Sequence, residues 1–327
     1  MSKIIRGIIS VCAALVLVTM GYIFAPATSV APQVEAVSVA VPHVSPAITT
    51  IAPRRDEPSV PEPAPLAAAP KYAAYNSYLY VPTRAQERQP LQVVIALHGM
   101  GGEGKSFGAG MIKEAERNGW VLVAPTIAYG DWHNPEAVAT EDIETTRRLI
   151  ATIDDLPART SLTLKPRVDI YGFSRGAQLA HRFAIFFPDR VDRVVAFSAG
   201  TYTLPDSFHS VLGGGRPDSM LMPYGVADLQ LRIGHPINPS RLRQVQFMIG
   251  VGAADNASAD VPRQWDEYLG KTRVERAREF TRALQRNGVP CTLLVYPAVG
   301  HEFTQPMLNT AVSFFTGPIP AVAPLLQ

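Results

Sequence analysis

Short apolar segments alternate with helix-like segments along most of this 327-residue chain, and this alternation constrains its fold more than any other feature. Continuous apolar runs bounded by Gly, Pro or Asp are typical of strands buried on both faces of a parallel sheet. A doubly wound α/β fold is therefore predicted, with a mostly parallel sheet, helices on both faces and function at the carboxyl ends of the strands. The expected strands lie at residues 75–81, 91–97, 120–123, 168–171, 194–197, 245–251 and 292–296, and the expected helices at residues 111–118, 136–156, 177–187, 274–287 and 304–315.

The first residues have the layout of an export signal. Lys3 and Arg6 precede an apolar run at residues 8–24, and small residues that suit a cleavage site follow it. The run is long for a cleaved signal and slightly short for a membrane span. Residues 1–25 are therefore interpreted as a signal peptide or an N-terminal membrane anchor. We expect an exported protein, whether periplasmic, secreted or tethered to a membrane through residues 8–24.

A proline-rich segment follows. Residues 26–71 are mostly Pro, Ala, Val and Ser, with almost no aromatic side chains. This composition favours an extended, polyproline-like and disordered linker, and the alternative is an unstructured leader with no spacing role. Aromatic residues return at Tyr72, so that a folded domain is expected over residues 72–327.

Charge and cysteine content exclude several kinds of site. The chain has 30 Lys and Arg against 28 Asp and Glu, a formal net charge of +2, which leaves no positive excess to hold a phosphate backbone. Its two cysteines, Cys12 and Cys291, are too few for a Cys-rich zinc site or a disulfide framework. We expect no nucleic-acid partner and no metal, and a fold that depends on packing.

The clearest motif is Gly172-Phe173-Ser174-Arg175-Gly176, which lies between an expected strand and an expected helix. Glycines two residues on either side of the serine permit a sharp strand-to-helix turn in which larger side chains would clash. This context predicts that Ser174 is a nucleophile. A helix-capping serine in an ordinary turn is the alternative.

A nucleophilic serine needs a base, and the base needs an acid. Asp255 and His301 each follow the end of an expected strand, and the chain order Ser, Asp, His is that of one known hydrolase arrangement. We predict a triad of Ser174, His301 and Asp255, with Asp260 and Asp228 as rival acids.

A glycine-rich loop follows the expected strand at residues 91–97. Its backbone N–H at Met100 is predicted to face the oxyanion that develops on the substrate, and the N–H of Arg175 should supply the second donor. His98 and Gly99 are interpreted as supporting residues, with His98 fixing the loop rather than acting in catalysis.

The long irregular stretch at residues 201–243 is expected to be a lid or a binding loop. Apolar side chains near the expected site suit an uncharged acyl or aryl group. The candidates for this pocket are Phe173, Tyr129, Trp132, Met220 and Met222.

Together these motifs resemble the α/β-hydrolase superfamily, and within it the secreted esterases related to polyhydroxybutyrate depolymerases, feruloyl esterases and dienelactone-hydrolase-like proteins. The resemblance implies an α/β-hydrolase domain that forms an acyl-enzyme at Ser174, needs no cofactor and acts on a small-molecule or polymer ester. Many of these secreted enzymes carry disulfides, and this chain lacks the cysteines for them. The resemblance covers residues 72–315 and rests on HGMGG at 98–102, YGFSRGA at 171–177, GAAD at 252–255 and GHEF at 300–303.

A second motif competes with this interpretation. Gly99–Ser106 matches the phosphate-binding pattern G-x-x-x-x-G-K-[ST] in full. Such a loop needs a helix that starts at its Lys and Ser, whereas Gly108 and Gly110 disfavour a helix there. The nearest acidic string, residues 149–155, falls within a helical pattern rather than a strand. Lys105 is therefore interpreted as a solvated loop charge, and nucleotide binding stays an alternative.

The same triad can cleave esters or peptides. We predict ester hydrolysis, because a peptidase would need an added device to recognise an amine terminus and residues 1–71 leave no room for one. A serine peptidase and a binding module without catalysis remain alternatives.

Overall fold

A computed structural model describes residues 33–35, 72–209 and 218–318. The expected signal or anchor at residues 1–25 and nearly all of the expected linker at residues 26–71 lie outside the described residues. Within the described part of the chain, no helix has the length and apolar character required to span a membrane.

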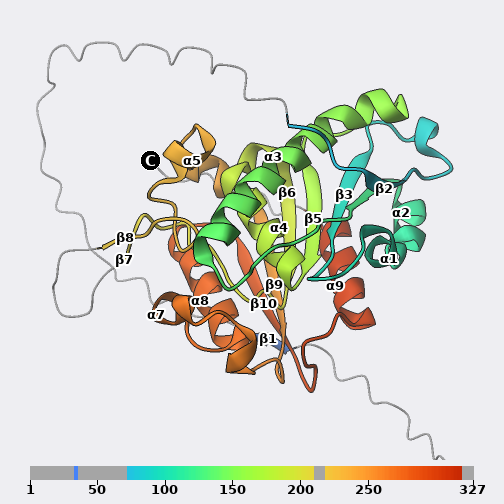
Figure 1. Ribbon diagram of the computed structural model, residues 1–327. Coiled ribbons are helices and arrows are strands. Elements are labelled where there is room, and N and C mark those ends of the chain that lie inside the picture. The colour runs from blue at the N-terminus through green and yellow to red at the C-terminus, as the bar shows by residue number, and fades with distance from the viewer. Residues whose placement is uncertain (1–32, 36–71, 210–217, 319–327) are drawn as a thin grey trace, which may run out of the picture. The chain divides into compact units, whose positions relative to one another are not determined.

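The centre of the fold is an eight-stranded sheet with the order β1-β10-β9-β6-β5-β3-β4-β2 (Figure 1). The strands from β10 to β4 in this order are parallel, and the edge strands β1 and β2 are antiparallel to their neighbours. The predicted doubly wound, mostly parallel sheet is confirmed. The strands are β1 (Gln33–Glu35), β2 (Ser77–Tyr80), β3 (Gln92–Leu97), β4 (Trp120–Pro125), β5 (Val168–Phe173), β6 (Val191–Phe197), β9 (Gln246–Gly252) and β10 (Cys291–Tyr296), while β7 (Phe208–His209) and β8 (Asp218–Ser219) form a separate pair.

Helices cover both faces of the sheet. Alternate side chains of β3 point to opposite faces: Val93, Ile95 and Leu97 pack with α3, α4 and α8, whereas Val94 and Ala96 pack with α2 and α9. Two apolar layers therefore enclose the sheet, as its continuous apolar strands require. The helices are α1 (Gly104–Ala109), α2 (Ile112–Asn118), α3 (Pro135–Thr160), α4 (Arg175–Phe186), α5 (Leu229–Ile233), α6 (Pro239–Leu242), α7 (Asp266–Leu269), α8 (Arg273–Arg286) and α9 (Gln305–Thr316).

Helix α1 forms where the sequence predicted none. The expectation that glycine would prevent a helix here was wrong, because two glycines let α1 approach β4 closely. A Cβ on Gly104 would lie 2.3 Å from the carbonyl oxygen of Ala124, and one on Gly108 would lie 2.9 Å from the Ala124 Cβ. Close helix-to-strand packing here outweighs the low helix propensity of glycine.

Two other segments differ from what the sequence predicted, one in the expected linker and one in the expected lid. β1 lies inside the range expected to be a linker, and its backbone pairs with β10. In the stretch at residues 201–243, the described part contains α5 and α6 and buries Tyr202 and Leu204 in the core. Residues 210–217 of this expected lid lie outside the described residues.

Candidate active site

Ser174 sits on the sharp turn between β5 and α4. Its φ of 53° and ψ of −115° are rarely adopted by residues other than glycine. The flanking glycines are required by close contacts: a Cβ on Gly172 would lie 2.4 Å from the Gly176 carbonyl carbon, and one on Gly176 would lie 2.1 Å from the Leu97 oxygen. The turn thus holds its serine in a strained, fixed backbone conformation.

The three residues of the predicted triad form one hydrogen-bonded chain. His301 Nε2 lies 2.9 Å from Ser174 Oγ, and His301 Nδ1 lies 2.8 Å from Asp255 Oδ2. They come from the carboxyl ends of β5, β9 and β10, which meet at one edge of the sheet because the strands are parallel. An ionised carboxylate can only accept, so Nδ1 carries the imidazole proton and Nε2 is free to accept the serine proton.

Asp255 is held in its ionised form. The side chain is buried, and its Oδ1 accepts a hydrogen bond of 3.0 Å from Arg273 Nη1. Burial alone would raise the pKa of Asp255, but the hydrogen bond from His301 and the positive charge of Arg273 outweigh it and bring the pKa below its usual value. The carboxylate is thus available to stabilise a protonated His301.

The rival acids do not contact His301. Asp228 Oδ1 accepts a hydrogen bond of 2.8 Å from the Met222 backbone, and the Asp228 carboxylate also pairs with Arg232. Asp260 lies at the rim of the pocket, where its backbone oxygen accepts a bond of 2.9 Å from Arg273 Nη2. Of the three carboxylates, Asp255 alone contacts the imidazole of His301.

The loop after β3 lies against Ser174. His98 is buried, its Nε2 accepts from the Ile127 backbone at 3.0 Å, and its Nδ1 donates to the Gly99 oxygen at 2.7 Å. With both ring nitrogens engaged in this way, His98 is a neutral residue that ties the loop to the segment after β4. A Cβ on Gly99 would lie 3.3 Å from the Ser174 Cβ, so the close approach of loop and serine needs a glycine.

A cavity of about 310 Å³ opens beside Ser174 and His301. Met100 and Arg175, the predicted oxyanion donors, both line it. Arg175 is the first residue of α4, a position whose N–H has no intrahelical acceptor and is free for a ligand. A second cavity of about 350 Å³ lies elsewhere and includes none of the triad residues. The remaining residues that line the first are Trp132, His133, Gln178, Gly200, Ala259, Asp260, Pro262 and Arg273.

The predicted pocket residues divide into two groups. Trp132 lines the cavity, and the Phe173 ring lies 5.0 Å from the His301 ring. Tyr129 does not line it: the ring lies under the guanidinium of Arg175, 5.0 Å away. The two methionines proposed for the pocket, Met220 and Met222, are buried in the core instead, because the described part of the 201–243 stretch packs against the domain.

Sequence reasoning missed Gln178 and Arg273 as pocket residues. Gln178 lies four residues after Ser174, one helical turn away, so the spacing along α4 could have revealed it. Arg273 begins α8, and nothing in its local sequence indicates that it would reach Asp255.

The residues of the competing phosphate-binding motif have other contacts. Lys105 is exposed on α1, and Ser106 Oγ donates to Glu103 Oε2 at 2.6 Å. Residues 149–155 lie within α3, as expected, and not on a strand. Neither Lys105 nor Ser106 lines the cavity beside Ser174.

No protein-family model matches this chain. No curated protein matches its sequence either.

Several solved structures are similar to it in three dimensions. Esterase PE8 is 18% identical, with 74% of this chain and 98% of that chain covered and a TM-score of 0.50. Poly(aspartic acid) hydrolase-1 from Sphingomonas sp. KT-1 is 20% identical over 75% of this chain and 97% of that chain, with a TM-score of 0.49. The phospholipase/carboxylesterase from Dyadobacter fermentans DSM 18053 is 16% identical over 75% and 98% of the two chains, with a TM-score of 0.48. The sheet order, the serine turn at the end of β5 and the likeness to PE8 together show that this chain has the α/β-hydrolase fold.

Proposed function

We propose that this protein is a serine hydrolase that cleaves carboxylic esters through an acyl-enzyme at Ser174. The observation that carries the proposal is the hydrogen-bonded chain from Asp255 through His301 to Ser174 beside an open cavity. A hydroxyl, an imidazole and a buried carboxylate in this order are the groups that acyl transfer requires.

The proposed reaction has two halves. Ser174 Oγ attacks the ester carbonyl carbon while His301 Nε2 takes its proton, and Asp255 stabilises the resulting imidazolium. The N–H groups of Met100 and Arg175 hold the tetrahedral oxyanion. His301 then returns the proton to the departing alkoxide, which leaves as an alcohol. Water activated by His301 attacks the acyl-enzyme in the same way and releases the acid and Ser174.

Ester substrates are favoured over peptides. The cavity is lined by Trp132 and Met100, which suit an uncharged part of a substrate. Among the described residues that line it, Asp260 at the rim is the one carboxylate that could receive an amine terminus. The name of esterase PE8, whose fold this chain shares, points the same way.

A panel of substrates tests the proposal. We expect 4-nitrophenyl esters of increasing acyl length to be hydrolysed faster than aminoacyl 4-nitroanilides, because among the described residues that line the cavity only Asp260, at the rim, carries a carboxylate that could receive the amino group of an aminoacyl substrate. Initial rates of nitrophenol and nitroaniline release measure the difference. Faster turnover of the anilides than of every ester would make the protein a peptidase instead.

Export is part of the same proposal. The basic residues and the apolar run at residues 1–25 support delivery across a membrane, with residues 8–24 either removed or kept as a tether. The proline-rich composition of residues 26–71 supports an extended linker between that segment and the hydrolase domain.

Replacing Lys105 by alanine is expected to leave kcat/KM for a 4-nitrophenyl ester within a few-fold of the wild-type value, because the side chain is exposed on α1 and lies outside the cavity. In a phosphate-binding loop the same change would remove the charge that pairs with the phosphates. Titration calorimetry with ATP checks this directly. Micromolar binding that is lost in Lys105→Ala would revive the nucleotide alternative.

A further inference from the structure

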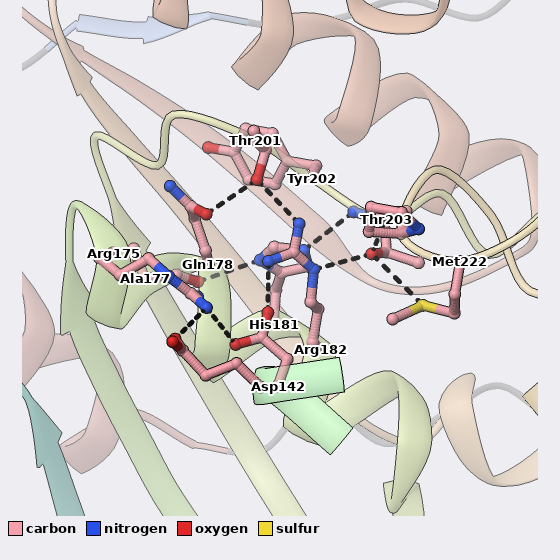
Figure 2. Close-up of polar contacts among 12 residues, drawn as sticks. Asp142, Arg175, Ala177, Gln178, His181, Arg182, Thr201, Tyr202, Thr203 and Met222 are labelled. Atoms are coloured by element: carbon pink, nitrogen blue, oxygen red, sulfur yellow. Dashed lines mark hydrogen bonds and ion pairs between the residues drawn. The ribbon is translucent and has the colours of Figure 1, made fainter. Parts of the chain in front are cut away.

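A buried polar network joins α3, α4 and the segment after β6 (Figure 2). Its centre is Arg182, which is fully buried and pairs with Asp142 Oδ2 at 2.6 Å. The other oxygen of Asp142 accepts from Arg175 Nη2, also at 2.6 Å. A buried carboxylate between two guanidinium groups holds both arginine side chains in fixed positions.

Arg182 determines which way a neighbouring hydroxyl points. Its Nη2 donates to Thr201 Oγ1 at 2.8 Å, and a guanidinium has no acceptor atom, so the Thr201 oxygen must accept. The single proton of this buried hydroxyl therefore needs another acceptor, which Gln178 Oε1 supplies at 2.9 Å. Thr203 behaves in the same way: it accepts from Arg182 Nε and donates to a backbone oxygen.

The orientation of the Gln178 amide follows. If the amide were reversed, its nitrogen would face Thr201 and the buried hydroxyl proton would lose its acceptor, which is unfavourable for a buried polar group. The Gln178 oxygen thus faces Thr201, and Nε2 with its two N–H groups faces the opposite way (Figure 2).

Nε2 of Gln178 lies at the wall of the catalytic cavity. A Cβ placed on Gly200, which lines the same cavity, would be 3.2 Å from Gln178 Nε2. Among the described residues, no acceptor forms a hydrogen bond with this nitrogen, whereas the amide oxygen is engaged by Thr201. Gln178 also follows Ser174 by one helical turn, and its backbone N–H donates to the backbone carbonyl oxygen of Ser174 at 3.1 Å.

We propose that Gln178 is a specificity-determining residue of this site, which selects substrates with an acceptor oxygen on the acyl group a few bonds from the scissile carbonyl. The inference rests on the proposed ester hydrolysis. An acyl group with a carbonyl or carboxylate oxygen satisfies the Nε2 donors of Gln178. A purely apolar acyl group of the same size covers these donors and leaves them unpaired, which penalises it.

The proposal is tested with three ethyl esters of matched acyl size: the pentanoate, the 4-oxopentanoate and the monoester of succinic acid. Their hydrolysis is measured by pH-stat titration. For the wild-type protein we expect kcat/KM for at least one oxygen-bearing ester to exceed that for the pentanoate by about tenfold or more. Whichever of the two oxygen-bearing esters is hydrolysed faster shows whether the preferred acceptor is a neutral carbonyl or a carboxylate. A wild-type ratio near one for both would overturn the proposal, even if no variant could be purified.

Variants assign the preference to Gln178. Gln178→Met keeps the side-chain length but removes the donors, and should lower the ratio of oxygen-bearing ester to pentanoate about tenfold. Gln178→Glu should lower the ratio for the succinate monoester further, because two carboxylates would face each other. A merely structural role would reduce kcat/KM for all three esters alike and leave the ratios unchanged, which would also overturn the proposal.

Gln285→Met is the matched control. Gln285 lies on α8, donates to the Cys291 backbone oxygen at 3.3 Å and does not line the cavity, so its replacement should leave the wild-type ratios in place. If none of the three esters is hydrolysed and a fluorophosphonate does not label Ser174, the proposed function itself fails, a result distinct from equal turnover of all three.

Discussion

Replacing Ser174 by alanine is expected to lower kcat for ester hydrolysis by about 10⁶-fold, in line with the loss of a nucleophile from other triads. Ser174 Oγ is the atom that His301 Nε2 contacts, and without it no acyl-enzyme can form. Initial rates with a 4-nitrophenyl ester measure the loss.

A fluorophosphonate probe supplies an independent measurement of the same prediction. It should label the wild-type protein at one site and leave Ser174→Ala unlabelled. Ser106→Ala, which changes an exposed serine on α1, is the matched control and should label normally. Labelling that persists in Ser174→Ala would place the nucleophile elsewhere.

Replacing Asp255 by asparagine is expected to lower kcat by about 10⁴-fold. The amide can present an N–H to His301 Nδ1, which favours the tautomer whose Nε2 is protonated and unable to accept the serine proton. The carboxylate charge that stabilises the imidazolium is lost as well. Single-turnover acylation rates, with thermal melting to confirm a folded protein, measure the effect.

Asp228→Asn is the matched control for Asp255→Asn. Asp228 pairs with Arg232 and a backbone N–H away from His301, so its replacement should leave the acylation rate close to that of the wild type. If Asp255→Asn kept full activity while Asp260→Asn lost it, the carboxylate at the pocket rim would be the triad acid.

Much of the fold and the core of the site could be predicted because they depend on local patterns. Buried parallel strands must be continuously apolar, and the turn after β5 admits only glycine at positions 172 and 176. An acid and a histidine just beyond two later strands must then come near Ser174, since parallel strands end at one edge of the sheet. The order of these three residues in the chain and their positions after expected strands were sufficient to predict that they lie together.

The features of the fold and the site that the sequence did not reveal depend on contacts between segments that are distant in the chain. Helix α1 is stabilised by the close approach of Gly104 to β4, which helix propensity alone does not indicate. Tyr129 looked like a pocket residue because it is aromatic and near the site in sequence, yet its ring packs beneath Arg175. The contact between Arg273 and Asp255 joins α8 to the end of β9, and the direction of the Gln178 amide is set by Arg182 through Thr201.

The distribution of the triad over β5, β9 and β10 has a consequence for biosynthesis. The ribosome delivers the chain from its N-terminus, so Ser174 and its turn emerge long before His301. A nascent chain that ends before β10 contains Ser174 and several parallel strands but lacks His301, the proposed base. Under the proposed mechanism, hydrolytic competence begins only when His301, which follows β10, has been made, and we expect fragments released by premature termination to be inert toward esters.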